Sequence, residues 1–177
     1  MGCILMYNDE LKRAMELLAK NKRVLFLGQQ IACPGSNTYT ILKDIPISKK
    51  IELPIIEDMQ MGISLGLALE GFIPVTMFAR MDFIIIALNQ LVNHLDKLEG
   101  MSCGRFKPKV IIRTIVGSTG PLNPGPQHSA DYTEALKCML KNVEVIKIMK
   151  VEDIVPSYEH ALKSKKSTLL VEVPDLY

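Results

Sequence analysis

The sequence lacks the features that mark nucleic-acid-binding and membrane proteins. Its 177 residues contain no Trp, and aromatic residues make up only 6%, so no platform for stacking bases is indicated. The formal net charge is +2, and runs of Lys or Arg do not exceed pairs such as Lys49-Lys50. No apolar stretch approaches the ~18 residues that a membrane-spanning helix needs. We therefore expect no nucleic-acid partner and no membrane partner.

Patterns for disulfides and metal ligation are missing as well. The four Cys residues lie far apart and form no C-x-x-C pair, and the three His residues show no ligand spacing such as H-E-x-x-H. Met1–Met6 is too short for a secretion signal, because polar residues follow from Tyr7 onward. Widely spaced Cys residues are typical of a reducing compartment. The sequence thus predicts a cytoplasmic protein that supplies no metal site of its own.

Three common motifs of phosphate binding and catalysis are not expected. No G-x-G-x-x-G follows the first predicted strand, and no G-x-x-x-x-G-K-[ST] occurs. No nucleophile elbow, in which a Ser sits at a sharp turn from a strand into a helix, is predicted either. Phosphate cradling by this chain therefore has no motif to support it.

What the sequence does contain is a regular alternation of helical and strand patterns. Hydrophobic residues make up 48%, and the length fits a single domain, residues 1–177. Short apolar runs predict strands, and apolar residues three and four apart predict helices. Strands are predicted at 23–28, 50–53, 72–77, 109–115, 144–149 and 168–173. Helices are predicted from a cap at Asn8 or Asp9, and at 38–42, 57–70, 82–99, 133–141 and 152–164, with a Gly- and Pro-rich loop at 117–129.

This alternation is typical of a mostly parallel sheet with helices on both faces. The predicted fold is therefore α/β, a three-layer, doubly wound domain. Ligands of such sheets bind beyond the carboxyl ends of the strands, so the loops after Gly28, Leu53, Met77 and Ile115 form the predicted site. Arg113 interrupts a strand that is otherwise apolar, and we predict a structural ion pair for it.

An ordered set of segments from residue 22 to residue 175 resembles a known family. That family is the beta subunit of 2-oxo acid dehydrogenase decarboxylases, the pyrimidine-binding side of the transketolase-like thiamine-diphosphate superfamily. The segments are LGQQIA at 27–32, LPIIEDMQMG at 53–62, GFIPV at 71–75, Asp82-Phe83, NQLVNH at 89–94, MSCG at 101–104, PKVIIR at 108–113, Gln127-His128-Ser129 and Leu170-Val171-Glu172.

The resemblance implies a division of labour between two chains. In this superfamily thiamine diphosphate lies between two related domains, of which one holds the diphosphate through a metal ion and the other holds the aminopyrimidine ring. The diphosphate side carries a Gly-Asp-Gly stretch, and this sequence has no Gly-Asp dipeptide. The chain is therefore expected to be a pyrimidine-binding domain, with Mg2+ held by an alpha-type, diphosphate-binding partner in a heterotetramer.

Glu57 matches the family's glutamate that hydrogen-bonds the pyrimidine N1′. A carboxylate at that point stabilises a proton on N1′, which favours the tautomer that activates the thiazolium carbon. The same resemblance makes Gln29 and Ile56 cofactor-binding residues. A plainer alternative is that Glu57 is a first-turn glutamate favoured by the helix dipole.

Phe83 and His128 complete the predicted site. Phe83 matches the position of an aromatic ring that lies against the aminopyrimidine, or it packs in the core. His128 matches a histidine at the mouth of the active site that aids proton transfer, and the alternative is an exposed residue just before a helix. The predicted catalytic residues are thus Glu57 and His128, and the predicted cofactor-binding residues are Glu57, Phe83, Gln29 and Ile56.

Two departures from the family bear on function. The family has an acidic residue where this sequence has Gln29, and its beta subunits continue into a further domain where this sequence ends at Tyr177. We therefore expect a decarboxylase or carboligase built from small subunits and acting on a 2-oxo acid. A split transketolase-type ketol transferase and a regulatory domain without catalysis are the alternatives.

Overall fold

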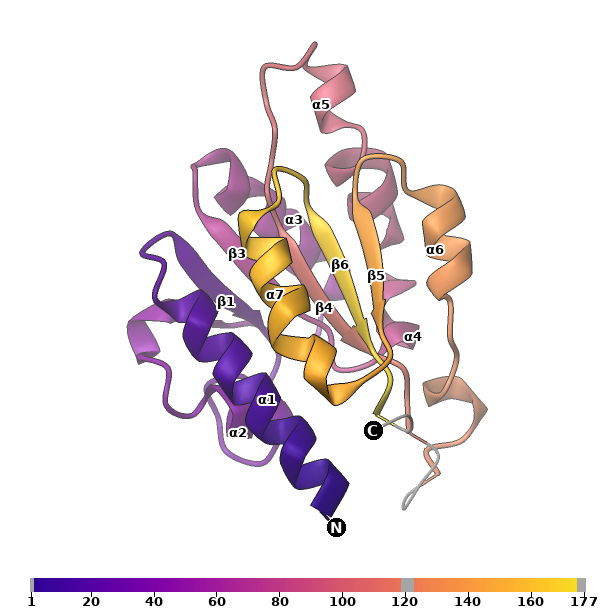
Figure 1. Ribbon diagram of the computed structural model, residues 1–177. Coiled ribbons are helices and arrows are strands. Elements are labelled where there is room, and N and C mark those ends of the chain that lie inside the picture. The colour runs from indigo at the N-terminus through magenta and orange to yellow at the C-terminus, as the bar shows by residue number, and fades with distance from the viewer. Residues whose placement is uncertain (1, 119–122, 175–177) are drawn as a thin grey trace.

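The computed structural model describes residues 2–118 and 123–174, which form a six-stranded sheet flanked by helices (Figure 1). The strand order is β2-β1-β3-β4-β6-β5, and neighbouring strands pair in parallel. The strands are β1 Val24–Gly28, β2 Lys50–Glu52, β3 Ile73–Met77, β4 Ile111–Ile115, β5 Glu144–Ile148 and β6 Thr168–Glu172. The α/β prediction is confirmed. Residues 119–122 of the predicted Gly- and Pro-rich loop lie outside the described residues.

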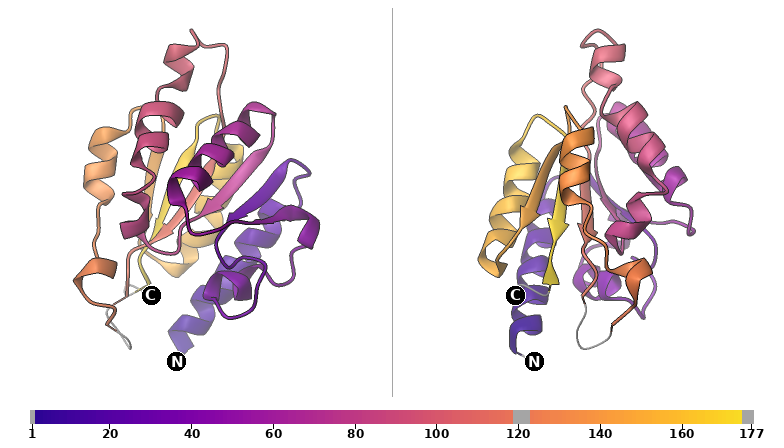
Figure 2. Two further views of the ribbon diagram at one scale, coloured as in Figure 1. Left: turned by 180° about the vertical axis from the view of Figure 1, so that it is seen from behind. Right: turned by 90° about the vertical axis from the view of Figure 1, so that its right-hand side faces the viewer.

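Helices cover both faces of this sheet (Figure 2). α1 and α7 pack on one face, and α3, α4, the π-helical segment η2 and α6 pack on the other. Their bounds are α1 Gly2–Ala19, α2 Asn37–Leu42, α3 Glu57–Leu69, α4 Met81–Ile84, η2 Asn89–Leu95, α5 Leu98–Met101, α6 Thr133–Met139 and α7 Ile154–Lys163. Shorter 3-10 turns lie at η1 Ile47–Lys49, η3 Pro126–His128 and η4 Val151–Asp153. Among the described residues, no helix has both the length and the apolar character needed to cross a bilayer.

Strand side chains divide between the two layers because successive residues point to opposite faces. Phe26 and Leu170 pack beneath α1 and α7, whereas Ile112, Leu169 and Val171 pack beneath the helices of the other face. Burial on both faces explains why the strands read as nearly continuous apolar runs in the sequence.

One predicted helix start is wrong. α1 begins at Gly2, so neither Asn8 nor Asp9 is its cap. The helix continues through the predicted apolar face, on which Leu11, Met15 and Leu18 are fully buried. Packing of that face against the sheet and α7 stabilises the part of the helix that was predicted.

The single helix predicted at 82–99 is also wrong, because it is divided into α4, η2 and α5. In η2 the backbone N–H of Asp96 donates to the carbonyl of Leu91, five residues earlier. The adjacent residues Leu95 and Asp96 are both buried, and Asp96 Oδ1 accepts hydrogen bonds from the backbone N–H groups of residues 141–143. The π-helical segment thus ends at a residue whose side chain binds a segment 45 residues further along the chain.

The ion pair predicted for Arg113 is confirmed, and its partner is Glu172. Both side chains are fully buried, with Arg113 Nη2 at 2.6 Å from Oε2 and Nε at 2.9 Å from Oε1. The hydroxyls of Tyr158, on α7, and Tyr7, on α1, also donate to this carboxylate. Burial alone would lower the pKa of Arg113, but the charge of Glu172 outweighs it and raises that pKa. The network fixes α1 and α7 to the middle of the sheet.

Candidate active site

The first element of the site is the sharp exit of the chain from β1. A Cβ atom on Gly28 would lie 2.8 Å from the carbonyl oxygen of Met77 on β3, so the two strands approach too closely for any other residue. Gln30 has a φ of 53°, in the left-handed region. The chain therefore turns directly after the strand, and Gln29 stands at the carboxyl-end edge of the sheet.

Glu52, the last residue of β2, holds this turn in place. Its Oε1 accepts a hydrogen bond from the backbone N–H of Gln30 at 2.5 Å, and its Oε2 accepts from those of Ile31 and Ala32, each at 2.8 Å. Three backbone donors of a loop are thus satisfied by one carboxylate. Glu52 is a positioning residue for the turn that carries Gln29.

Glu57 begins α3 and is only 5% exposed. The start of a helix favours a carboxylate, because the helix dipole is positive there. The side-chain amide Nε2 of Gln29 donates to Oε1 of Glu57 at 3.1 Å. Within the described residues no hydrogen bond reaches Oε2 of Glu57, so this oxygen can accept one from a bound ligand.

Phe83 and His128 form a second pair at the same end of the sheet. Their rings meet edge to face, with centroids 5.6 Å apart and an interplanar angle of 89°. Arg80 Nη1 donates to the backbone carbonyl of His128 at 3.4 Å. A Cβ atom on Gly117 would lie 1.8 Å from the same carbonyl oxygen, so a glycine is required where the chain leaves β4. Arg80 therefore contacts the backbone of His128, and Gly117 leaves room for its carbonyl group.

The loop that follows His128 is tethered to β5 through Asp131. Lys147 Nζ lies 2.6 Å from Oδ2 of Asp131, and the backbone N–H and hydroxyl of Thr133 donate to Oδ1. Burial alone would raise the pKa of Asp131, but the hydrogen bonds from Lys147 and Thr133 outweigh it and lower that pKa. This anchor restrains the segment between η3 and α6.

The five predicted site residues all lie at the carboxyl-end edge, in two pairs with Ile56 beside them. Gln29 is joined to Glu57 and Phe83 to His128, and no hydrogen bond or ring contact links the two pairs among the described residues. Ile56 is 50% exposed. Exposed Ile55, Ile85 and Ile86 add to the apolar surface that adjoins Glu57 and Phe83 along the chain, as is typical of a surface that contacts another molecule.

Sequence reasoning missed three residues that support the candidate site: Glu52, Arg80 and Gly117. A carboxylate that ends a strand beside the loop of the neighbouring strand is the only signal that could have indicated Glu52. Arg80 and Gly117 act on a backbone carbonyl that is far from them in sequence, so no local pattern marks them.

The sequence does contain G-x-S-x-G, at Gly62–Gly66, but in a place that excludes a nucleophile elbow. The segment lies inside α3 rather than at a turn after a strand. Ser64 is fully buried, and its hydroxyl donates to the backbone carbonyl of Gln60 at 2.8 Å. Nor does any cluster of His, Cys, Asp and Glu in the described residues have the composition and geometry to hold a metal ion.

Comparisons with known proteins give relatives in sequence and neighbours in fold. No family model matches the chain. It is 27% identical over 138 residues to the pyruvate dehydrogenase E1 component subunit beta of Cyanidium caldarium, covering 76% of this chain and 40% of that protein. It is also 27% identical over 176 residues to the same subunit of Chlorokybus atmophyticus, covering 96% of this chain and 51% of that protein.

The fold has close neighbours among solved structures. An inactive beta4 tetramer of a split-gene transketolase matches with a TM-score of 0.72 and 17% identity, over 97% of this chain and 51% of that one. The chain thus spans about half or less of the length of the curated relatives that it matches. Its sequence relatives and its fold point in the same direction: the chain is similar in sequence to about half or less of each pyruvate dehydrogenase E1 beta subunit, and its fold is that of a transketolase-like domain.

Proposed function

We propose that this chain is the pyrimidine-side subunit of a heteromeric thiamine-diphosphate enzyme that decarboxylates a 2-oxo acid and releases or transfers the resulting aldehyde or acyl unit. The observation that carries the proposal is the buried Glu57 carboxylate, of which Oε1 is held by Gln29 and Oε2 is open to a donor. The names of the relatives support the reaction class, because pyruvate is a 2-oxo acid.

The kinds of side chain present suit an aminopyrimidine ring. Such a ring needs a carboxylate beside one nitrogen, an aromatic face and apolar surroundings, and in this proposal Glu57, Phe83 and Ile56 take these three roles. When bound, thiamine diphosphate supplies the nucleophilic carbon and the electron sink for the carbonyl substrate. Glu57 holds a proton at the ring nitrogen, and Phe83 orients the ring. His128, whose backbone is contacted by Arg80, exchanges a proton with the substrate.

The diphosphate and its Mg2+ belong, in this proposal, to an alpha-type partner chain, and the assembly is a heterotetramer. We place the enzyme in the cytoplasm, with residues 1–177 acting as one pyrimidine-binding domain. Cys33, Cys103 and Cys138 are free and exposed, as suits a reducing compartment.

Titration calorimetry of thiamine diphosphate tests the proposal. The chain alone should bind the cofactor weakly or not at all, and the complex purified with its partner should bind it in a Mg2+-dependent way. Glu57→Gln should weaken binding to the complex, whereas Asp58→Asn on the next residue of α3 should leave it unchanged. Tight binding by the isolated chain, or a complex with no affinity for the cofactor, refutes the shared site.

Ketol transfer between sugars is the second candidate, because the fold matches a split-gene transketolase. The substrate that the assembled complex consumes distinguishes decarboxylation from ketol transfer. A complex that consumes pyruvate or another 2-oxo acid supports decarboxylation, and one that acts only on ketose phosphates supports ketol transfer. A complex that binds the cofactor and turns over neither substrate class supports a regulatory domain.

A further inference from the structure

The amino-terminal edge of the sheet, opposite the Glu57 site, concentrates positive charge. Five segments form this edge, because each leads into one of the long parallel strands: 20–23, 69–72, 97–110, 141–144 and 163–167. The short β2 begins opposite Phe26, in the middle of β1, so the segment before it lies away from this edge. They contain eleven of the 21 Lys and Arg residues and three of the 19 Asp and Glu residues. Their formal charge is +8, against +2 for the chain, so the rest of the sequence carries −6. We call these five segments the basic edge.

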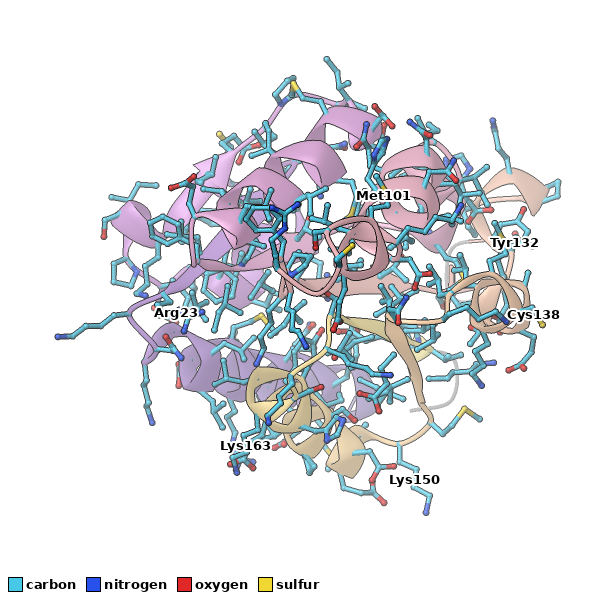
Figure 3. All side chains as sticks on the ribbon, turned by 90° about the horizontal axis from the view of Figure 1, so that it is seen from above. Arg23, Met101, Tyr132, Cys138, Lys150 and Lys163 are labelled. Carbon is cyan, nitrogen blue, oxygen red and sulfur yellow. The ribbon has the colours of Figure 1, made fainter. Side chains whose placement is uncertain are left out.

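Hydrogen bonds hold the segments of the basic edge side by side. Arg23 Nε donates to the carbonyl of Gly71 at 2.6 Å, which joins the first two segments. Lys109 Nζ donates to the carbonyls of Leu162 and Ser164, which joins the third segment to the fifth. Figure 3 looks down on this end of the molecule, where Arg23, Met101 and Lys163 are labelled. The backbone N–H of Glu144 donates to the carbonyl of Ser167, which joins the fourth segment to the fifth, and the pairing of β3 with β4 places the two groups next to each other. The charge therefore lies along one edge of the sheet.

Part of this charge has a structural purpose. Lysines complement the negative ends of helices, and Lys141 donates to the carbonyl of Cys138 in the last turn of α6. Lys107 and Lys163 pair with glutamates at 2.8 and 2.6 Å.

Three lysines of the basic edge have no such structural role. Lys22, Lys165 and Lys166 are exposed, and their side chains donate no hydrogen bond within the part of the chain that the structure describes. The positive charge also affects a residue within the basic edge. Burial lowers the pKa of Lys109, and the charge of Arg23 lowers that pKa further. Positive charge at the basic edge is thus only partly compensated within the chain.

The same edge exposes large apolar side chains. Met101 is 64% exposed, Phe106 50%, Leu69 43% and Phe72 38%. The first two belong to α5 and the loop after it, which project beyond the end of the sheet (Figure 1). A surface that combines exposed apolar side chains with one sign of charge is suited to a partner that complements both.

We propose that the basic edge docks a protein partner whose contact surface combines Asp or Glu residues with apolar ones. An anionic membrane is a poorer fit, because the apolar residues come from separate segments rather than from one face of an amphipathic helix. Nucleic acid is a poorer fit, since Phe72 and Phe106 are the exposed aromatic rings at the edge. The docking surface lies at the opposite end of the strands from Glu57. A partner bound there leaves the catalytic end accessible, and the inference does not depend on the proposed reaction.

The test uses a fluorescent, Glu-rich peptide of roughly 20 residues with Leu at every fourth position, about the size of one side of a standard interface. Its affinity for the chain is measured by fluorescence anisotropy. The variant Lys22→Glu/Lys165→Glu/Lys166→Glu should raise the Kd roughly tenfold or more. The control Lys43→Glu/Lys137→Glu/Lys150→Glu changes the net charge equally at exposed lysines outside the basic edge and should leave the Kd within about twofold. Phe106→Ser should weaken binding further, and Met149→Ser should not.

Three outcomes overturn the proposal: wild-type chain that shows no saturable binding, triple variants that weaken binding equally, or tighter binding of a DNA duplex or of phosphatidylserine vesicles through the same lysines. Chemical-shift mapping of the peptide on the wild-type chain gives a second readout that needs no variant. Perturbations confined to the five segments support the docking surface, and perturbations spread over the molecule contradict it.

Discussion

The Gln29 side-chain amide donates a hydrogen bond of 3.1 Å to the Glu57 carboxylate, across the gap between the end of β1 and the start of α3. An amide neither takes up nor releases a proton near neutral pH, so Gln29 orients Glu57 without sharing a proton with it. The family that this chain resembles has an acidic residue at the position of Gln29, whereas this chain has an amide that donates a hydrogen bond. The proposed proton at the pyrimidine nitrogen therefore depends on Glu57 alone.

Gln29→Glu should destabilise the fold in a pH-dependent way. Two carboxylates at this distance repel each other when both are ionised, and protonation of one removes the repulsion. The loss of melting temperature relative to wild type should therefore be larger at pH 8 than at pH 5. Thermal melts at both pH values measure it, and Gln30→Glu on the exposed neighbour is the control. An equal loss at both pH values would show that the two groups do not interact.

Glu57→Gln should lower kcat of the assembled enzyme by roughly 10²-fold or more, because the amide cannot stabilise a proton on the cofactor ring. The helix start tolerates Gln, so assembly measured by size-exclusion chromatography should be unchanged. Asp58→Asn, which alters only a contact with Gln90 at 3.2 Å, should keep most of the activity. Wild-type turnover in Glu57→Gln would remove Glu57 from the mechanism.

Phe83→Ala should chiefly weaken cofactor binding. The lost ring contact is worth about 0.5–1.5 kcal/mol beyond burial, which corresponds to roughly a threefold to tenfold rise in Kd. Calorimetry on the complex measures this value. Phe72→Ala, at the other end of the sheet, is the matched control, and a similar loss in both variants would mean that Phe83 acts only through packing.

Arg113→Met should reduce the free energy of unfolding by about 3–5 kcal/mol, because it leaves Glu172 charged and buried without its partner. The double variant Arg113→Met/Glu172→Gln should recover part of that loss, since a neutral amide still accepts from the Tyr7 and Tyr158 hydroxyls. Urea denaturation measures both. A double variant that is no more stable than the single one would show that the charge of Glu172 is not the cause.

Stability should fall in acid partly through Asp131. The pKa of Asp131 is lower in the folded chain than the ordinary value near 3.8, so its contribution is complete above that ordinary value and is lost as the pH falls through the lower, folded one. Asp131→Asn should remove this part of the pH dependence. Melting temperatures between pH 2 and pH 6 measure it, with Glu134→Gln at an exposed pair as control. Identical profiles in wild type and Asp131→Asn would contradict the role of Lys147 as its partner.

Much of the fold could be predicted from the sequence because both faces of a parallel sheet are buried. The strands therefore appear as apolar runs, and five of the six agree with the prediction to within a residue at each end. The helix predicted at 82–99 is divided where a long-range contact is made. Asp96 binds the backbone of residues 141–143, and a helical periodicity carries no record of that contact.

The candidate site could be predicted only as a set of residues. The resemblance named Gln29, Ile56, Glu57, Phe83 and His128, and the topology placed them at one edge. The pairing of Gln29 with Glu57 and of Phe83 with His128 depends on side-chain directions that the sequence does not encode locally. The backbone supports, Glu52 and Arg80, were missed for the same reason.

The way in which Glu52 holds its turn affects which residues of that turn can vary. Its carboxylate contacts only main-chain amides of residues 30–32, so the turn beside the site is held without reference to the side chains that it carries. Ile31 is nevertheless fully buried in the core, and Gln30 has a left-handed φ, so the three positions differ in how freely they can change. A library that keeps Ile31, varies residue 32 and restricts residue 30 to side chains that tolerate a left-handed φ should accordingly keep most of its members folded.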